Sequence, residues 1–314
     1  MRHALPPLLA VLAAVLGAAG CGLGAGESRE GGASLLVTRD FGTRQVGDSA
    51  VDPIPGGETV MRMLQRDFDV DTRYGGGFVQ SINGIAGGRA NGRPVDWFYF
   101  VNGVLAEDGA AAHDVAPGDR VWWDHRDWGA SQDVRAVVGA FPEPFKSGVD
   151  GKRLPVRLDC AADADAVCDE VGERLEAVGV YAGRSAAGSF GGEGVLRVKV
   201  GRWAAVRADP AVRRLEQGPR AAGVFARPTA AGDEIALLGP EGEVERTLGP
   251  GGGLVAATQL GGEAPTWVVT GTDEVGLAAA AAQLQEDALR RRFAIAVEDG
   301  RPTPLPLMPP PETP

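Results

Sequence analysis

The amino-acid sequence predicts an α+β protein built from short strands, short helices and many turns. Glycine and proline are abundant, with 47 and 22 in 314 residues, which favours short elements over a helical bundle. Over residues 34–140 two strand patterns, one helix and several further strands follow in that order. Over residues 151–300 strands alternate with helices, which is typical of an α/β or α+β sandwich. We therefore expect two domains of different architecture.

The N-terminus has the layout of a secretory signal over residues 1–20. A basic start precedes an apolar run at residues 4–16, which is too short for a stable membrane span. Small residues then lead to Cys21, and this arrangement resembles a bacterial lipoprotein cleavage site, after which Cys21 would carry a lipid. The alternative is an ordinary cleaved signal with a free cysteine. With the lipid, Cys21 and a flexible tether at 22–33 would hold the chain to a bacterial membrane on its extracytoplasmic side.

The other two cysteines, Cys160 and Cys168, predict a disulfide in an exported domain. Cys160 ends a strand pattern, and Cys168 lies about one turn into the helix expected to follow it. A bridge would therefore join a strand end to the next helix. Two alternatives remain: a pair of unlinked thiols, and a zinc site, which is the least favoured because no second cysteine or histidine pair accompanies them.

The net charge excludes one class of partner. A formal charge of −11 argues against nucleic-acid binding, which needs clustered Lys and Arg. The run Arg290–Arg292 is better explained as a helix end, where cations interact favourably with the dipole. No segment after the signal is apolar enough to cross a membrane, so the lipid would be the only anchor.

The first domain is expected over residues 34–140. Thr59 is a good N-cap for a helix whose apolar residues recur on one face. Asn102-Gly103 suits a two-residue hairpin turn, since both positions of a type I′ turn need positive φ. The strands are expected at residues 34–41, 45–51, 78–82, 97–101, 104–105 and 120–124. Two strands, a helix and then further strands is the order of a β-grasp.

Three motifs in this domain resemble a known family. They are Phe78–Gly84, Trp97–Gly103 and Pro117–Trp123, and together they are similar to the transcobalamin-like C-terminal domain. That β-grasp module closes over cobalamin in animal carriers and also occurs in bacterial surface proteins. The resemblance implies binding, not catalysis, and makes a corrinoid the first candidate ligand. The animal carriers also use a large helical barrel, and no run of helical hairpins long enough to build one occurs here.

Aromatic residues of this domain are the candidate ligand contacts. Strand alternation places Trp97 and Tyr99 on one face and Phe98 and Phe100 on the other, so one set packs on the helix and the other faces something else. That second face either stacks on a ligand, a glycan or a partner, or is covered by the second domain. The candidate ligand-binding residues are Phe98, Tyr99, Phe100, Asn102, Trp122, Trp123 and Trp128.

The second region begins after a proline-rich linker at residues 141–150 and resembles no family known to us. Its pattern predicts an α/β domain over 151–300, ending with a helix at 274–289 and a strand at 293–297. The glycine run 251–253 indicates a flexible turn. The proline-rich tail, 301–314, is expected to be disordered.

Motifs for catalysis and metal binding are missing from the sequence. No serine has a nucleophile-elbow context, no phosphate-binding loop is present, and the two histidines that follow the signal are isolated. Asp273 is better explained as a helix cap than as part of an anion site. We therefore predict no catalytic residues, no metal ligands and no cofactor, with cobalamin only as a candidate ligand.

Three functions remain open on this basis. The leading hypothesis is a non-enzymatic, lipid-anchored envelope protein whose β-grasp domain binds a small ligand such as a corrinoid. The second is a structural or adhesion module that binds an envelope polymer or a protein partner. The third is an envelope enzyme, because paired carboxylates can lie far apart in sequence. A concave cleft would favour the first hypothesis and a flat aromatic face the second.

Overall fold

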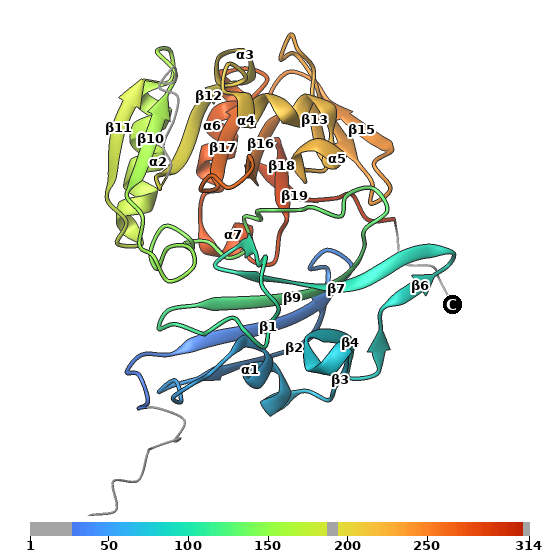
Figure 1. Cartoon of the computed structure of the whole chain (residues 1–314). Helices are drawn as coiled ribbons and strands as arrows, with labels where there is room; N and C mark the ends of the chain where they lie inside the picture. The colour runs from blue at the N-terminus through green and yellow to red at the C-terminus, as the bar shows by residue number, and fades with distance from the viewer. Residues whose placement is uncertain (1–26, 187–193, 310–314) are drawn as a thin grey trace, which may run out of the picture.

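The computed structural model describes residues 27–186 and 194–309, and it confirms the predicted α+β class. Two large sheets lie one above the other, with helices and smaller sheets around them (Figure 1). Residues from both halves of the sequence share a buried core between them, which includes Phe100, Trp122, Phe225 and Phe293. The signal peptide and Cys21 lie outside the described residues, so their assignment stays a prediction.

The first large sheet has six strands in the order β2-β1-β9-β7-β6, with β8 also paired to β7. β1 and β9 are parallel, and the other pairs are antiparallel. A parallel pair between two hairpin arms, with one helix crossing the sheet, is the β-grasp arrangement expected from the sequence. The strands are β1 (Ala33–Arg39), β2 (Arg44–Val51), β6 (Gly88–Ala90), β7 (Arg93–Val101), β8 (Val104–Leu105) and β9 (Arg120–Asp127).

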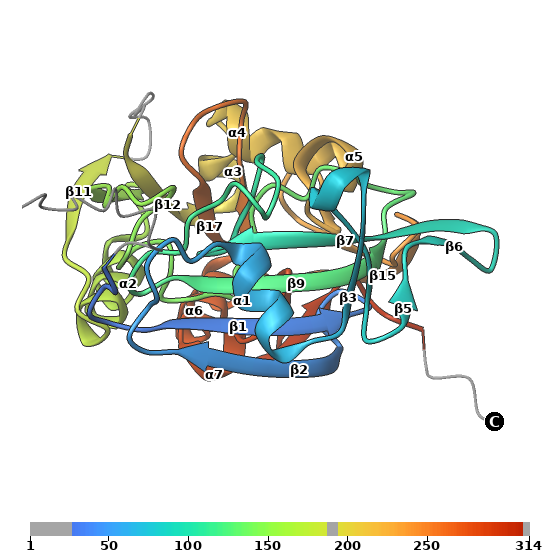
Figure 2. The ribbon, with the colours of Figure 1, turned by 60° about the horizontal axis from the view of Figure 1, so that its bottom comes forward.

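Helix α1 (Val60–Asp67) lies across one face of this sheet (Figure 2). The Thr59 side chain accepts a hydrogen bond from the backbone N–H of Arg62 at 3.2 Å, so the predicted cap is confirmed. The buried side of the helix shares a core with Leu35, Val37 and Val121 of the sheet. Beyond the helix lies a small sheet of β3 (Val70–Arg73), β4 (Phe78–Ile82) and β5 (Ile85–Ala86), with a 3₁₀ turn, η1 (Tyr74–Gly76), between the first two.

The predicted hairpin turn is confirmed at Asn102-Gly103. Their φ angles are 55° and 78°, and Val101 pairs with Val104 across the turn. Both central residues are thus left-handed, as a type I′ turn requires.

The second large sheet has seven strands in the order β11-β10-β12-β17-β16-β18-β19. The first four are parallel, and the last three join antiparallel. The strands are β10 (Val156–Cys160), β11 (Ala182–Ala186), β12 (Leu196–Arg202), β16 (Gly253–Thr258), β17 (Thr266–Gly271), β18 (Ala294–Glu298) and β19 (Arg301–Leu305). A three-stranded sheet of β13 (Ala226–Pro228), β14 (Ile235–Leu238) and β15 (Val244–Leu248) shares the core between the large sheets.

Two helices, α2 (Asp165–Ala177) and α6 (Glu274–Ala282), contact each other and the seven-stranded sheet. Valines of β10, β12 and β17 share a core with them. The remaining helices are short: α3 (Trp203–Val206), α4 (Pro210–Arg213), η2 (Arg214–Gln217), α5 (Pro219–Ala222) and α7 (Glu286–Leu289). The predicted disulfide joins Cys160 at the end of β10 to Cys168 in α2.

Several predictions for the second half are wrong in detail. Gly253 opens the fully buried strand β16 instead of a turn, and the helix expected over 274–289 is divided into α6 and α7. The tail is not disordered from residue 301, because Arg301–Leu305 form β19 and pair with β18. β19 contains two prolines, which cannot donate ladder hydrogen bonds, and it accordingly lies at the sheet edge.

The expected linker at 141–150 is also part of the core. Phe141 and Phe145 are buried, and their rings lie 6.0 and 4.9 Å from that of Trp267. The segment therefore packs on the second sheet and is not an exposed spacer.

Candidate ligand-binding site

The predicted aromatic contacts are divided between two faces of the six-stranded sheet, as strand alternation requires. Phe100 and Trp122 face the second half of the chain and are buried beneath it. The ring of Phe293, which immediately precedes β18, lies 5.7 Å from Phe100 and 5.3 Å from Trp122. The prediction that Phe100 and Trp122 contact a ligand is therefore corrected. The second half of the chain covers this face, which was the alternative interpretation of the sequence.

Asn102 is also buried, and its hydrogen bonds are structural. Its side-chain amide donates to Asp119 at 2.9 Å and to the carbonyl of Gly148 at 3.1 Å, and its oxygen accepts from the N–H of Arg120. All polar atoms of the side chain are therefore engaged within the protein. Asn102 holds the hairpin turn to its neighbours and leaves no group for a ligand.

On the other face, Tyr99 and Trp123 stack with ring centroids 4.8 Å apart. The Tyr99 hydroxyl donates to the carbonyl of Asp108 at 2.6 Å. Burial, and secondarily the charge of Asp108, raises the pKa of Tyr99 well above its usual value, so the phenol stays protonated. The Nε1–H of Trp123 is buried and has no hydrogen-bond partner among the described residues.

These two rings line a pocket of about 250 Å³, the candidate site. Along one edge of β7, β6 pairs as far as Val95 and β8 pairs from Phe100 onward. The pocket lies beside the residues between them, 96–99. At this interval no described strand pairs with β7 on that side. The lining residues are Gly77, Phe78, Val79, Trp97, Phe98, Tyr99, Leu105, Ala106, Gly109, Ala110, Trp123, Gln132 and Asp133. We call this the aromatic pocket.

Two exposed aromatic side chains lie next to the aromatic pocket. Phe78 lines it and is 39% exposed, and Tyr74 is 86% exposed, with its ring edge-on to Phe78 at 6.1 Å. Gly75 and Gly76, at φ 75° and 95°, form the tight turn that presents Tyr74. Such neighbouring exposed rings provide stacking surface without needing further rearrangement of the core.

The last two predicted contacts are partly buried. Phe98 lines the aromatic pocket, and the guanidinium carbon of Arg126 lies 3.9 Å from its ring centroid. Trp128 lies outside the pocket lining and donates through Nε1 to Asp96 at 3.0 Å. The pocket thus brings together Phe98, Tyr99 and Trp123 of the seven predicted residues. It adds Phe78 and Trp97, whose strand patterns marked them as aromatic strand residues but not as contacts.

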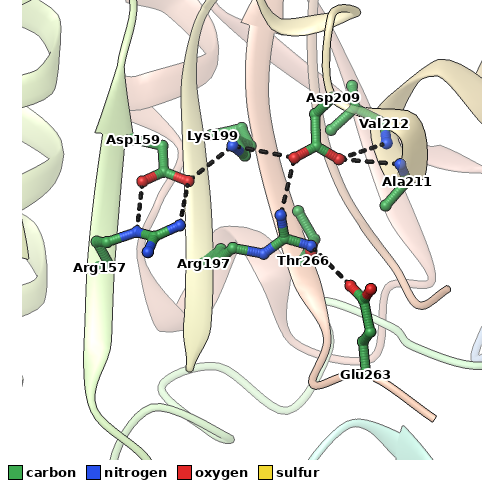
Figure 3. Close-up of polar contacts among 9 residues, drawn as sticks. All are labelled: Arg157, Asp159, Arg197, Lys199, Asp209, Ala211, Val212, Glu263 and Thr266. Atoms are coloured by element: carbon green, nitrogen blue, oxygen red, sulfur yellow. Dashed lines mark hydrogen bonds and ion pairs between the residues drawn. The ribbon is translucent and has the colours of Figure 1, made fainter. Parts of the chain in front are cut away.

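A buried ionic network on the seven-stranded sheet matches no sequence motif and was not predicted (Figure 3). Lys199 Nζ lies 2.7 Å from Asp159 and 3.0 Å from Asp209, and all three side chains are almost fully buried. Arg157 bonds Asp159, while Arg197 bonds Asp209 at 2.8 Å and Thr266. Asp209 also caps α4 through the N–H groups of Ala211 and Val212. Glu263 also pairs with Arg197, at 3.2 Å, so three carboxylates match the three cations, and the network ties β10, β12 and α4 together.

Within residues 27–186 and 194–309, no group of three or more His, Cys, Asp and Glu side chains is placed to hold a metal ion. The same residues contain no helix that is both long enough and apolar enough to cross a membrane.

Comparison with protein families gives one match. Residues 57–126 match the family described as Domain of unknown function (DUF4430). The match runs from the turn before α1 to the end of β9 and includes most of the aromatic pocket, but it covers less than a quarter of the chain. No curated protein matches this chain. We call residues 57–126 the DUF4430 region, and the seven-stranded sheet lies outside it.

Proposed function

We propose that this protein is a non-enzymatic, lipid-anchored ligand-binding protein of a bacterial envelope, and that the aromatic pocket of the DUF4430 region is its ligand site. The observation that carries the proposal is the pocket itself, a concavity walled by aromatic rings. The ring of Trp123 belongs to this wall, and its buried Nε1–H has no hydrogen-bond partner among the described residues. Apolar walls with a few oriented polar groups are typical of small-molecule sites.

The ligand we propose is a molecule with a flat ring system, and a corrinoid is the first candidate. The support is the resemblance of residues 34–140 to the transcobalamin-like domain, together with the exposed rings of Tyr74 and Phe78. A pocket of about 250 Å³ is below the range of roughly 300–1,000 Å³ that encloses a whole small ligand. It would therefore hold one edge or side group while the ring plane lies against Tyr74 and Phe78.

The proposed location rests on the N-terminal sequence and on the cysteines. A disulfide between Cys160 and Cys168 suits an oxidising compartment outside the cytoplasm. Lipid on Cys21 would leave the tether 22–33 to separate the folded part from the membrane. Cys21→Ser should release the protein from the membrane fraction into the soluble extracytoplasmic fraction. Retention of the variant in the membrane would contradict the anchor.

The test of ligand binding is a titration of the mature chain carrying Cys21→Ser with cobalamin and with cobinamide. Tryptophan fluorescence and the corrin spectrum are followed together, since Trp97 and Trp123 line the pocket. Phe78→Ala should weaken binding about tenfold, because one stacked aromatic ring contributes about 1–1.5 kcal/mol beyond simple burial. Tyr181→Ala is the matched control: it is 80% exposed and lies beside β11, outside the DUF4430 region.

Saturable quenching that Phe78→Ala weakens and Tyr181→Ala leaves unchanged is the expected result. Absence of quenching at high ligand concentration would reject the corrinoid. The exposure of Tyr74 and Phe78 also supports a second candidate function, docking on an envelope polymer through stacking. Sedimentation with purified cell-wall material that is lost in Tyr74→Ala, without any corrinoid binding, would favour that function.

A further inference from the structure

A second cavity, of about 670 Å³, lies at the C-terminal end of β1. Its walls come from the β1–β2 turn, the β6–β7 turn, the end of β9 and the last described residues of the chain. In Figure 1 the chain beyond β19 runs toward β6, in agreement with this lining. Its volume is within the range of sites that enclose small organic ligands. We call it the arginine cavity.

The charge of the arginine cavity is opposite to that of the protein. Four arginines line it, Arg39, Arg44, Arg93 and Arg126, against two aspartates, Asp40 and Asp127. His125 also lines it, and burial lowers the pKa of this imidazole, which favours the neutral form. The lining is therefore net positive in a chain whose formal charge is −11. A positive concavity in an acidic protein concentrates anions.

Arg39 and Arg44 have hydrogen-bond donors that no described residue uses. Both approach the same carboxylate, Asp40, and their contacts through Nε, at 3.6 and 3.5 Å, are longer than a normal hydrogen bond. Their terminal Nη atoms have no hydrogen bond to any described residue. Arg93 differs, because it is held by Asp127 at 3.2 Å and by Glu241.

Arg126 adds positive charge to the cavity although its side chain is buried. It is 1% exposed, and its Nη atoms donate to the carbonyls of Ser131 and Gln132. Its buried Nε has no partner among the described residues. A desolvated guanidinium of this kind adds positive potential to the cavity that solvent screens poorly.

The backbone of the turn between Arg39 and Arg44 is strained. Asp40 and Phe41 have φ angles of 58° and 57°, a conformation that non-glycine residues seldom adopt. The turn persists because the N–H groups of Phe41 and Gly42 donate to the buried carboxylate of Asp124, at 3.1 and 2.9 Å. Strain held by such contacts is found mostly at functional sites.

We propose that the arginine cavity binds a small organic molecule bearing a phosphate. The anion pairs with the free Nη donors of Arg39 and Arg44, in the forked geometry that guanidinium groups prefer. The organic part lies against the apolar wall formed by Phe41, Val95, Pro240 and Met308. This site is separate from the aromatic pocket and does not depend on the function proposed for it.

The test is calorimetric titration of the mature chain, carrying Cys21→Ser, with phenyl phosphate, inorganic phosphate and phenol. Phenyl phosphate should bind saturably and more tightly than either of the other two. The double variant Arg39→Gln/Arg44→Gln should bind it at least about tenfold more weakly. Asp40→Asn should bind it several-fold more tightly, since the competing carboxylate is gone.

Two controls separate this site from other effects. Arg246→Gln removes an exposed arginine from a single ion pair with Glu298, both outside the lining of the cavity, and it should leave binding unchanged. Phe78→Ala, which alters the aromatic pocket, should also leave it unchanged. Absence of saturable heat with phenyl phosphate, equal binding of inorganic phosphate, or binding that Arg39→Gln/Arg44→Gln does not weaken would each overturn the proposal.

Discussion

Replacing Lys199 by methionine should strongly destabilise the fold, although the two side chains are similar in length. Lys199 Nζ lies between the carboxylates of Asp159 and Asp209, at 2.7 and 3.0 Å, and the lysine side chain is 0% exposed. The thioether fills the same space but supplies no charge. Both aspartates keep one arginine, and Asp209 keeps the N–H of Ala211, so neither is left wholly unpaired.

The expected loss of stability in Lys199→Met depends on the partners that Asp159 and Asp209 retain. Removing one partner of a buried ion pair costs about 3–5 kcal/mol. Because each carboxylate retains an arginine, we expect the lower end, about 3 kcal/mol, out of a total stability of about 5–15 kcal/mol. Burial works against ionised Asp209, but its hydrogen bond with Lys199 and the charges of Lys199 and Arg197 hold its pKa below the usual value. That contribution is present at neutral pH and is lost as the pH falls through the lowered pKa, so the deficit of the variant should shrink in acid.

The assay is urea denaturation followed by circular dichroism in a series from neutral pH down to about pH 2, because the lowered pKa of Asp209 lies below the ordinary pKa of an aspartate. Lys146→Met is the control, because Lys146 is exposed and its replacement should change stability by less than about 0.5 kcal/mol. A loss below about 1 kcal/mol for Lys199→Met would refute the reasoning, because it would place the network in a solvated, weakly coupled environment.

Three other changes test the rest of the fold. Burial raises the pKa of Asp124 to about 6, from 3.8 for a free aspartate, so the stability that its neutral form contributes is present below about pH 4 and lost as the pH rises through about 6. Asp124→Asn should remove this pH dependence of stability, which is worth up to about 3 kcal/mol. Melting temperatures recorded between about pH 4 and about pH 6 measure it. Reduction of Cys160–Cys168, which are eight residues apart, should lower stability by about 2.5 kcal/mol in denaturant titrations with and without dithiothreitol. Phe293→Ala should cost about 3–5 kcal/mol, because this buried ring contacts aromatic residues of the six-stranded sheet, and two separate thermal transitions in place of one would show that it couples the sheets.

The features that the sequence predicts well are those with local causes. Thr59 caps α1 through a contact three residues away, and Asn102-Gly103 adopt left-handed angles that few other pairs tolerate. The disulfide belongs to the same group, since a short loop between a strand end and the next helix brings the two cysteines together.

Pairing between distant segments could not be predicted in the same way. β16 begins at a glycine and β19 contains two prolines, so neither has strong strand propensity. Each becomes a strand because β18 lies between them and pairs with both. Likewise, the alternation around Arg197 and Lys199 is ordinary for a strand with one solvated face, and their burial depends on Asp159 and Asp209 from other segments.

The aromatic residues show most clearly why the candidate site was only partly predictable. Period-two alternation separates Trp97 and Tyr99 from Phe98 and Phe100, but it cannot say which face a second sheet will cover. Coverage by the second half buries Phe100 and Trp122, and the aromatic pocket lies instead at the edge of β7, between its pairings with β6 and β8. The register of two short strands, not the number of tryptophans, therefore decides where the aromatic pocket lies.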